Sequence, residues 1–304
     1  MIRRIYKGAL VALMFMAASL AAQAEKEYKP FVLAYKTSGS MNAVVSDVKQ
    51  KLTAGGFEVV GSYSPYPTAT IIGVTNDSLK KHAAQSENGG FGVAQRVSVT
   101  QVGNEIQVSY TNPTYMAFVY RMKGNNADVT AAMKSALGAN MEFGPEEGLE
   151  EEDAREYHYK IMMPYFDDAI KIAEYGSYKE AVSKVEAGLA SGKHGATKVY
   201  SVNVSGKDET LFGVALGNNI DGKQDGSDKF VMAEIDFKPV RSTAHLPYDI
   251  LVSGNKVYAL PAEFRIAINF PDLSMMGANS FMNIMGCPTV ISNMLAKTAG
   301  NDNF

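Results

Sequence analysis

The feature that most constrains the fold of this chain is an internal duplication. A segment running from Ser40 to Gly55 recurs at a constant offset as Ser177 to Gly192. The shared positions are a Ser that can cap a helix, apolar residues spaced for one helix face, and a Gly where a helix can end. Because any two capped amphipathic helices look alike, this block needs support from further repeats. The matched residues are Ser40, Val45, Ser46, Val48, Leu52 and Gly55 in the first copy and Ser177, Val182, Ser183, Val185, Leu189 and Gly192 in the second.

Further blocks repeat in the same order. Ile71-Ile-Gly-Val74 pairs with Leu211-Phe-Gly-Val214, and Gly103-Asn104 pairs with Gly254-Asn255. A Gly-Asn pair between two apolar runs is typical of a hairpin, since both residues tolerate positive φ. Each copy therefore predicts a strand, a helix, a strand and a later hairpin. This order indicates an α+β fold of two homologous units, each with helices packed on an antiparallel or mixed sheet.

The duplication and the composition divide the chain into four predicted parts. A run of acidic residues separates the copies, which is typical of a solvated linker or helix face. Within this linker a helix is expected from about Leu149 to Met163, where Pro164 would end it. The parts are residues 1–24 as a signal peptide, 25–143 as the first unit, 144–168 as the acidic linker and helix, and 169–304 as the second unit with a methionine-rich helical tail.

The N-terminal residues have the three parts of a secretory signal. Basic residues from Arg3 to Lys7 precede an apolar run, and Ala22-Gln23-Ala24 forms a small-x-small cleavage site. The apolar run is shorter than the roughly 20 residues that a membrane-spanning helix needs. We therefore expect cleavage after Ala24 and a soluble protein that is periplasmic or secreted, with no membrane association after cleavage.

The net charge limits which classes of partner the protein can bind, and the cysteine content limits how its fold can be stabilised. Cleavage of the signal would remove three of the 29 basic residues and none of the 32 acidic ones, leaving a net charge of about −6. This sign argues against a nucleic-acid partner, which requires a basic surface to displace counterions from phosphates. The single cysteine, Cys287, excludes an internal disulfide, so the fold must be stabilised by packing.

Longer strings in the chain carry a family resemblance. They are Gly89-Gly-Phe-Gly92 and Val108-Ser-Tyr-Thr-Asn-Pro113 in the first unit, Tyr157-His-Tyr159 and Met163-Pro-Tyr-Phe-Asp-Asp168 in the linker, and His245-Leu-Pro-Tyr-Asp-Ile-Leu-Val252 and Arg265-Ile-Ala-Ile-Asn-Phe-Pro-Asp272 in the second unit. These strings resemble the domain-of-unknown-function family 302 (DUF302), small α+β domains of bacteria and archaea. The resemblance covers about Tyr28 to Ala299 and implies a tandem, exported form of the family.

The resemblance implies a fold and transfers no site, because the family has no agreed catalytic residues. The second unit also departs from the family pattern, since Tyr258-Ala-Leu-Pro261 replaces Ser-Tyr-x-x-Pro. The two units therefore need not bind the same ligand.

Histidine and aromatic residues gather in two places, around His158 in the linker and from His245 onward in the second unit. If the linker folds over the second unit, these side chains are expected to line one pocket with Arg265 as the partner of an anionic group. The alternative is that the tyrosines are half-buried packing residues. The candidate ligand-binding residues are Tyr157, His158, Tyr165, Asp167, His245, Tyr248 and Arg265.

The C-terminal tail is unusually rich in methionine. Thioether and thiolate sulfurs are the donors that Cu(I) prefers, and copper is handled outside the cytoplasm. The alternative is core packing, because Met fills gaps in apolar cores and Phe281, Ile284 and Met285 fit one helix face. The sequence Cys287-Pro288 is expected to begin a helix. The candidate metal ligands are Met282, Met285 and Cys287, with Met275 or Met276 as a further donor.

Signatures of established chemistry are absent from the sequence. It contains no Gly-x-Ser-x-Gly elbow, phosphate loop, His-Glu-x-x-His or Cys-x-x-Cys, so no cofactor is expected. The leading interpretation is a non-catalytic periplasmic protein that binds a small molecule or a periplasmic protein in a groove built from the two units. The alternatives are an enzyme with His158 or His245 as a general base beside a tyrosine hydroxyl, and a copper-handling protein.

Overall fold

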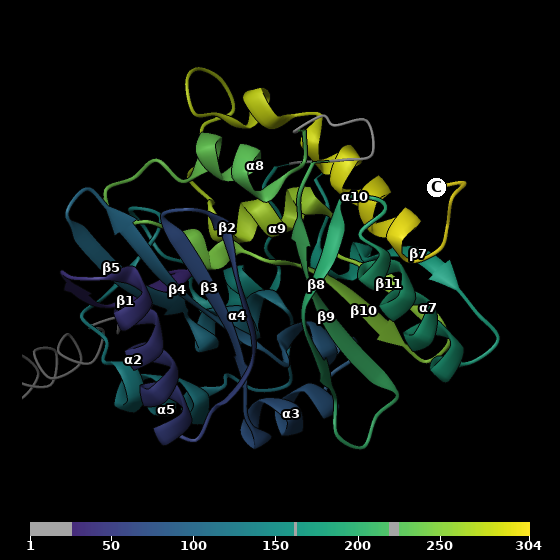
Figure 1. Cartoon of the computed structure of the whole chain (residues 1–304), viewed down its shortest axis with the longest axis horizontal. Coiled ribbons are helices and arrows are strands. Elements are labelled where there is room, and N and C mark those ends of the chain that lie inside the picture. Colours follow the sequence, from purple (N-terminus) through teal and green to yellow (C-terminus); the bar gives the residue numbers. More distant parts are fainter. Residues whose placement is uncertain (1–25, 161–162, 219–224) are drawn as a thin grey trace, which may run out of the picture.

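The computed structural model describes residues 26–160, 163–218 and 225–304, so the predicted signal peptide lies outside the described residues. Two sheets stand side by side with helices packed on them (Figure 1). The predicted α+β class is confirmed, and both sheets are antiparallel in every described strand pair. No helix in these ranges is both long enough and apolar enough to cross a membrane.

The first sheet has the strand order β2-β3-β4-β5-β1-β6. Its elements are β1 (Phe31–Thr37), α2 (Met41–Ala54), β2 (Glu58–Tyr66), β3 (Ala69–Thr75), α3 (Asp77–Ala84), the 3-10 helix η1 (Gly89–Gly92), β4 (Gln95–Val102), β5 (Glu105–Thr111), α4 (Pro113–Val119), α5 (Ala127–Leu137) and β6 (Met141–Phe143).

The linker and the second unit follow. The second sheet has the order β7-β11-β10-β9-β8. The elements are α6 (Glu151–Arg155), η2 (Phe166–Asp168), β7 (Ile170–Glu174), α7 (Tyr178–Ser191), β8 (Ala196–Asn203), β9 (Glu209–Leu216), α8 (Asp228–Ile235), η3 (Thr243–His245), β10 (Tyr248–Ser253), β11 (Lys256–Ala259), α9 (Ala262–Asn269), η4 (Phe281–Ile284) and α10 (Cys287–Thr298).

The same order of elements occurs in both units. From β1 to α4 the first unit runs strand, helix, two strands, helix, 3-10 helix, two strands and helix, and the second unit repeats this order from β7 to α9. The strand order β2-β3-β4-β5-β1 likewise matches β8-β9-β10-β11-β7, and β6 is an addition at the edge of the first sheet. Each element of the second unit from β7 to α9 thus has a counterpart in the first.

The duplicated helices α2 and α7 have the predicted boundaries. Each has 14 residues, with Ser40 or Ser177 at the N-cap and Gly55 or Gly192 at the C-cap. The second copy is the better capped, because the Ser177 side chain accepts a hydrogen bond from the Glu180 backbone N–H and Gly192 is left-handed at φ 60°. The Ser40 side chain makes no such bond.

Three apolar clusters hold most of the fold together. One lies between the first sheet and helices α2 and α5, and another between the second sheet and α7, α8 and α10. The third contains side chains from both units, among them Phe91, Tyr115 and Phe118 of the first and Leu211, Leu251 and Phe264 of the second. The two units therefore share a core in addition to having one each.

The linker helix is shorter than the sequence indicates, because it is confined to Glu151–Arg155. Beyond it, the Tyr157 hydroxyl donates to the Ala267 backbone carbonyl at 3.3 Å and the Tyr159 hydroxyl donates to that of Leu273. These two bonds tie the chain to the second unit at alternate residues, which suits an extended segment better than a helix. The helical pattern of the sequence is therefore overridden by tertiary contacts.

We expect replacement of Leu52 or Leu189 by Ala to lower the free energy of unfolding by about 2 to 5 kcal/mol, because each leucine packs its helix on a sheet. The exposed fractions of the two side chains are 0% and 1%. Chemical denaturation measures the change. Gln50→Ala in α2 and Lys184→Ala in α7 replace exposed residues and should change the unfolding free energy by less than about 0.5 kcal/mol. A cost as small as that for either leucine would contradict the described packing of its helix.

Candidate functional site

The two units pack against each other through equivalent elements. The 3-10 helix η1 of the first unit packs on β9 and β10, and its counterpart η3 of the second packs on β4 and β5. The edge strands β2 and β8 lie next to each other where the sheets meet (Figure 1). Each unit thus contributes the same parts to the interface, in an approximately two-fold arrangement.

Repeated glycines make this close approach possible. The Tyr200 ring of β8 lies against Gly73 of β3 and Gly213 of β9, which are equivalent positions in the sequence repeat. A Cβ atom at Gly73 would lie 2.5 Å from the ring, and one at Gly213 would lie 2.4 Å from it. Any larger residue at either position would displace the tyrosine. Sequence reasoning found both glycines as repeat markers and missed their shared contact.

A buried ionic cluster lies at the centre of the interface. Arg96 of β4 donates to the carboxylate of Asp249 of β10, and Arg265 of α9 lies 3.6 Å from the same carboxylate oxygen. All three side chains are 1% exposed. Burial is the largest single influence and disfavours the charged guanidinium, but the Asp249 carboxylate together with Tyr200 and Tyr120 raises the pKa of Arg96. Strand register pairs Arg96 with Gly73 and Asp249 with Gly213, so the two charges occupy equivalent places in the two units.

The guanidinium of Arg265 connects this ion pair to polar groups of both units. Arg265 donates to the Tyr120 hydroxyl of the first unit and to the backbone carbonyls of His245 at 2.9 Å and Pro247 at 3.1 Å. The His245 ring lies 3.0 Å from the Asn269 side-chain nitrogen through Nδ1. Burial, followed by the Arg265 and Arg96 charges, holds the pKa of His245 well below its usual range, so this imidazole is neutral.

The predicted ligand-binding residues of the second unit therefore lie in the interior. His245 and Tyr248 contact each other edge to face, with ring centroids 5.5 Å apart, and both are 1% exposed. Arg265 is buried to the same degree. As described, these three side chains stabilise the contact between the units and present almost no surface to a ligand.

The predicted residues of the linker lie nearer the surface. The His158 ring stacks on Tyr165 with centroids 4.4 Å apart, and Asp167 forms an ion pair with Arg121 at 2.9 Å. Tyr157 lines a surface pocket of about 620 Å³ together with Tyr159 and acidic residues of the linker. Sequence proximity thus places His158 with Tyr165 and His245 with Tyr248, in two different environments.

The predicted metal ligands lie in two different environments, because Cys287 is buried and the two methionines are exposed. Cys287 is 3% exposed at the start of α10, and burial raises the pKa of its thiol. Met282 is 49% exposed and Met285 is 62% exposed, so the core-packing interpretation is wrong for these two methionines. The helix face expected from Phe281 to Met285 is instead the short 3-10 helix η4, which ends before Met285. No group of three or more His, Cys, Asp or Glu side chains within the described ranges is arranged to hold a metal ion.

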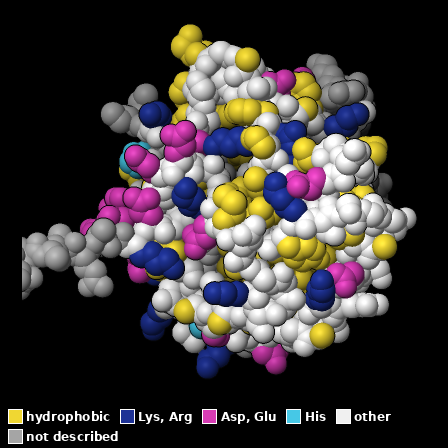
Figure 2. Space-filling model, turned by 90° about the vertical axis from the view of Figure 1, so that its left-hand side faces the viewer, with side chains coloured by type: hydrophobic (Ala, Val, Ile, Leu, Met, Phe, Trp, Pro, Cys, Tyr) yellow, Lys and Arg dark blue, Asp and Glu magenta, His cyan; other side chains and the backbone are white. Residues whose placement is uncertain are grey.

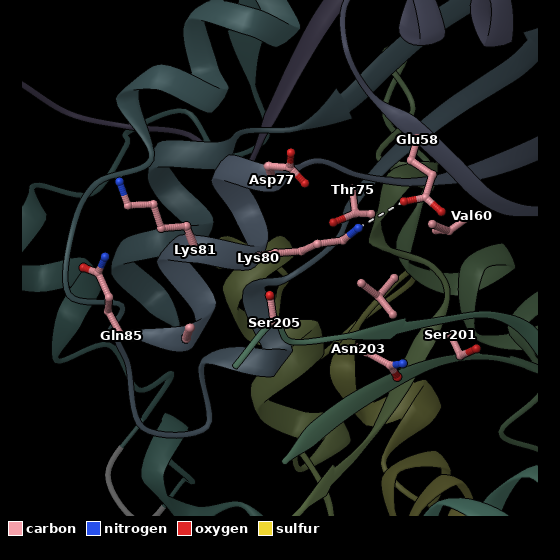
Figure 3. Close-up of a pocket in the computed structure, with 12 residues that line it drawn as sticks. Glu58, Val60, Thr75, Asp77, Lys80, Lys81, Gln85, Ser201, Asn203 and Ser205 are labelled. Atoms are coloured by element: carbon pink, nitrogen blue, oxygen red, sulfur yellow. Dashed lines mark hydrogen bonds and ion pairs between the residues drawn. The ribbon is translucent and has the colours of Figure 1, made fainter. Parts of the chain in front are cut away.

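A polar groove of about 910 Å³ lies between the units, beside the contact of β2 with β8 (Figure 3). In this groove Lys80 of α3 extends toward Glu58 of β2 and pairs with it at 3.1 Å. Asp77 and Lys81 of α3 form no ion pair with any described residue. The first unit contributes Glu58, Val60, Thr75, Asp77, Lys80, Lys81, Ala84 and Gln85, and the second contributes Ser201, Val202, Asn203 and Ser205.

Local structure explains why the groove is polar. Helix α3 is capped by Asn76, whose side chain accepts a hydrogen bond from the Leu79 backbone N–H. It buries Leu79 and Ala83 and leaves Asp77 and Lys81 on its solvent side. The repeated helices predicted from the sequence are α2 and α7 and not α3, and the strand β8 that faces α3 across the groove comes from the other unit. The signal that could have indicated the groove is the duplication itself.

A second contact between the units contains carboxyl groups with raised pKa values. The Tyr63 hydroxyl of β2 donates to Asp228 of α8 at 2.8 Å, and the Leu216 backbone N–H donates to the same oxygen at 3.0 Å. Burial raises the pKa of Asp228 to about 7, against which the bonds from Tyr63 and Leu216 act only partly. Burial likewise raises the pKa of Asp236, at the end of α8, to about 6.

Comparison with known proteins gives one structural similarity. The chain is similar to the crystal structure of an uncharacterized conserved protein, DUF302, from Bacillus stearothermophilus, with 18% sequence identity and a TM-score of 0.31. The match covers 34% of this chain and 94% of that chain. No protein-family model and no curated protein matches this sequence. The fold assignment therefore rests on the strand order of the chain itself.

We expect Asp249→Ala to lower the unfolding free energy by about 3 to 5 kcal/mol, because it leaves Arg96 buried without its carboxylate. The exposed residue Asp208 provides the control, since Asp208→Ala removes a carboxylate from the surface. A double variant, Arg96→Met with Asp249→Leu, should recover much of the loss because it removes both charges. Urea denaturation measures all three. Equal stability of Asp249→Ala and the control would show that the ion pair is not buried in solution.

The pKa of Asp228 predicts an unusual dependence of stability on pH. A carboxyl group whose pKa rises from 3.8 to about 7 on folding binds its proton more tightly in the folded state. Its contribution to stability is therefore full below about pH 4 and is lost as the pH rises through about 7. Asp236 acts in the same direction up to about pH 6.

Asp228→Asn keeps the acceptor for Tyr63 and removes the charge. We expect it to raise the melting temperature at pH 8 and to weaken the decline in stability between pH 5 and pH 8. Thermal unfolding across this range measures the effect, and Asp208→Asn is the control. A wild-type melting temperature that rises steadily from pH 5 to pH 8, with no gain in the Asp228 variant, would contradict it.

Proposed function

We propose that this chain is a non-catalytic binding protein that holds a small polar molecule in the groove between its two units. The observation that carries the proposal is the composition of the groove walls, which come from β2, β3 and α3 of one unit and from β8 of the other. Its volume of about 910 Å³ falls within the range of small-molecule sites. A ligand held there would contact both units at once.

The lining of the groove favours a ligand that carries both charges. Lys81 and Asp77 supply one cation and one anion that form no ion pair within the described residues, and Lys80 is already neutralised by Glu58. Ser201 and Asn203 add hydroxyl and amide groups from the opposite wall. A zwitterion such as an amino acid or short peptide would satisfy this set better than a polyanion, which would meet the carboxylates.

The chemistry of the groove supports binding in preference to catalysis. A nucleophile is activated by a base held next to it, and the lining residues include no His or Cys, while the hydroxyls of Thr75, Ser201 and Ser205 form no hydrogen bond with a basic or carboxylate side chain among the described residues. His245, which lies beside Asn269 and Tyr248, is neutral and buried in the interface. An enzyme using that residue would have to separate the two units to admit a substrate.

Location and family form part of the same proposal. The complete signal sequence supports export followed by cleavage after Ala24, and therefore a periplasmic or secreted protein. The strings that resemble DUF302 in both units support a tandem arrangement of that family, with unit boundaries near residues 144 and 168. A binding protein outside the cytoplasm fits the acidic net charge and the absence of cofactor signatures in the sequence.

The proposal is tested with protein purified from the periplasmic fraction under native conditions. We expect native mass spectrometry to show a bound small molecule, or a thermal-shift screen of amino acids and dipeptides to identify one. Asn203→Trp fills the groove from the β8 side and should weaken binding at least about tenfold, because a bulky ring occupies the ligand volume.

Thr197→Trp is the matched control, since it places the same side chain on an exposed position of the same strand outside the groove lining. Binding that is unchanged in Asn203→Trp, or lost equally in Thr197→Trp, would exclude this groove as the site.

A further inference from the structure

The segment between α9 and α10 presents four methionines to solvent. Met275, Met276, Met282 and Met285 are between 41% and 72% exposed. Figure 2 shows hydrophobic side chains protruding at the upper end of the molecule, the end at which Figure 1 places this segment. Five other methionines are core residues, with exposed fractions of 4% or less at Met116, Met122, Met133, Met232 and Met294, whereas Met141 in β6 is 47% exposed.

The backbone of this segment brings the methionines together. The Met282 N–H donates to the Met275 carbonyl at 3.1 Å, and the Phe281 N–H donates to the Ser274 carbonyl at 2.9 Å, so residues 275 and 282 are neighbours across a closed loop. Met285 N–H donates to the Met282 carbonyl at 3.4 Å. In a 3-10 turn the side chains at i and i+3 are eclipsed, which places Met282 and Met285 on one side.

The same turn separates anchoring side chains from exposed ones. Phe281 and Ile284 are also three residues apart, and they are 9% and 1% exposed in the core of the second unit. They fix the turn, and the thioethers of Met282 and Met285 face outward as a consequence. Packing explains Phe281 and Ile284, but it does not explain why Met282 and Met285 are methionines.

Polar side chains hold the loop in this shape. The hydroxyl of Ser280, which is 0% exposed, donates to the Gly277 carbonyl at 2.9 Å. The Asn283 side chain links the loop to Glu234 of α8 at 3.1 Å. Gly277 at φ 103° and Asn279 at φ 51° form the turn between the two arms. The loop is therefore organised before any ligand binds, which lowers the entropic cost of binding.

We propose that the loop from Ser274 to Met285 is a Cu(I) site whose ligands are the thioethers of Met275, Met282 and Met285, with Met276 available as a fourth. Uncharged thioether sulfur is a soft donor that selects Cu(I) over Mg²⁺, Ca²⁺ and other hard cations. Cys287 is not a ligand in this arrangement, because its side chain is buried in the core of the second unit. The site is independent of the groove between the units.

The first test is competition for Cu(I) with a colorimetric chelator under anaerobic conditions. The mature wild-type protein should take up one Cu(I) ion. Met282→Leu and Met285→Leu should each lower the affinity by at least the roughly 10- to 100-fold seen for lost supporting contacts at metal sites, because each removes a donor while keeping the volume. Met141→Leu in β6 replaces a methionine that is 47% exposed elsewhere and should have no effect. Cys287→Ser should retain full affinity.

The second test needs no variant and uses Ag(I), a soft ion of the same charge, with the protein labelled by 13C at the methionine methyl groups. We expect shifts in the signals of Met275, Met282 and Met285 at one equivalent, and none in that of Met141. Failure of the wild-type protein to take Cu(I) from a weak chelator would overturn the proposal. So would loss of binding in Cys287→Ser with retention in both leucine variants. Neither outcome bears on ligand binding in the groove, which is tested separately with Asn203→Trp.

Discussion

The arrangement of the two units depends on a buried carboxylate shared by two guanidinium groups. Asp249 comes from one sheet, Arg96 from the other, and Arg265 from the helix that follows the second sheet. Removal of three charges from water is costly and is compensated only when the geometry holds them together. The two sheets must therefore meet in one relative position, and the surrounding apolar side chains pack in the arrangement that this position sets.

The position of the groove follows from this interface. Its walls are β2 and α3 on one side and β8 on the other, so their separation is set by how the units pack. Tyr200 fixes that distance, since its ring fills the space left by Gly73 and Gly213. A ligand that contacts both walls would add to the contact between the units, and would stabilise the folded protein by an amount that grows with the logarithm of its concentration above Kd.

Sequence patterns predicted the repeated helices and hairpins well, but they did not predict which elements of the two units contact each other. The periodicity of α2 and α7, their Ser and Gly caps, and the Gly-Asn hairpins are local signals, and the structure contains each of them. The groove could not be predicted, because Lys81 and Asn203 belong to different units and nothing in their local sequence links them. His245 and Arg265 illustrate the opposite difficulty. A histidine and an arginine among aromatic residues suggest a ligand site, yet here they pair with buried groups at an interface.

The methionine-rich tail shows that residue spacing typical of an α-helix can give a wrong prediction of which side chains are buried. Phe281, Ile284 and Met285 fit one face of an α-helix, but the segment forms a single 3-10 turn in which only the first two are buried. Gly277, at φ 103°, lies in the turn before this segment, and Gly286 after it is the N-cap of α10.

The equivalent placement of Arg96 and Asp249 has a consequence for how the two halves could ever associate as separate chains. In a symmetric pair of identical first units, arginine would face arginine at the two-fold axis, and in a pair of second units aspartate would face aspartate. Either combination would bury like charges with no counterion from the partner. In the mixed pair Arg96 instead faces the carboxylate of Asp249, which Arg265 of the second unit shares. The first half is therefore complementary to the second at this position, whereas a copy of the first half would bring two buried arginines together.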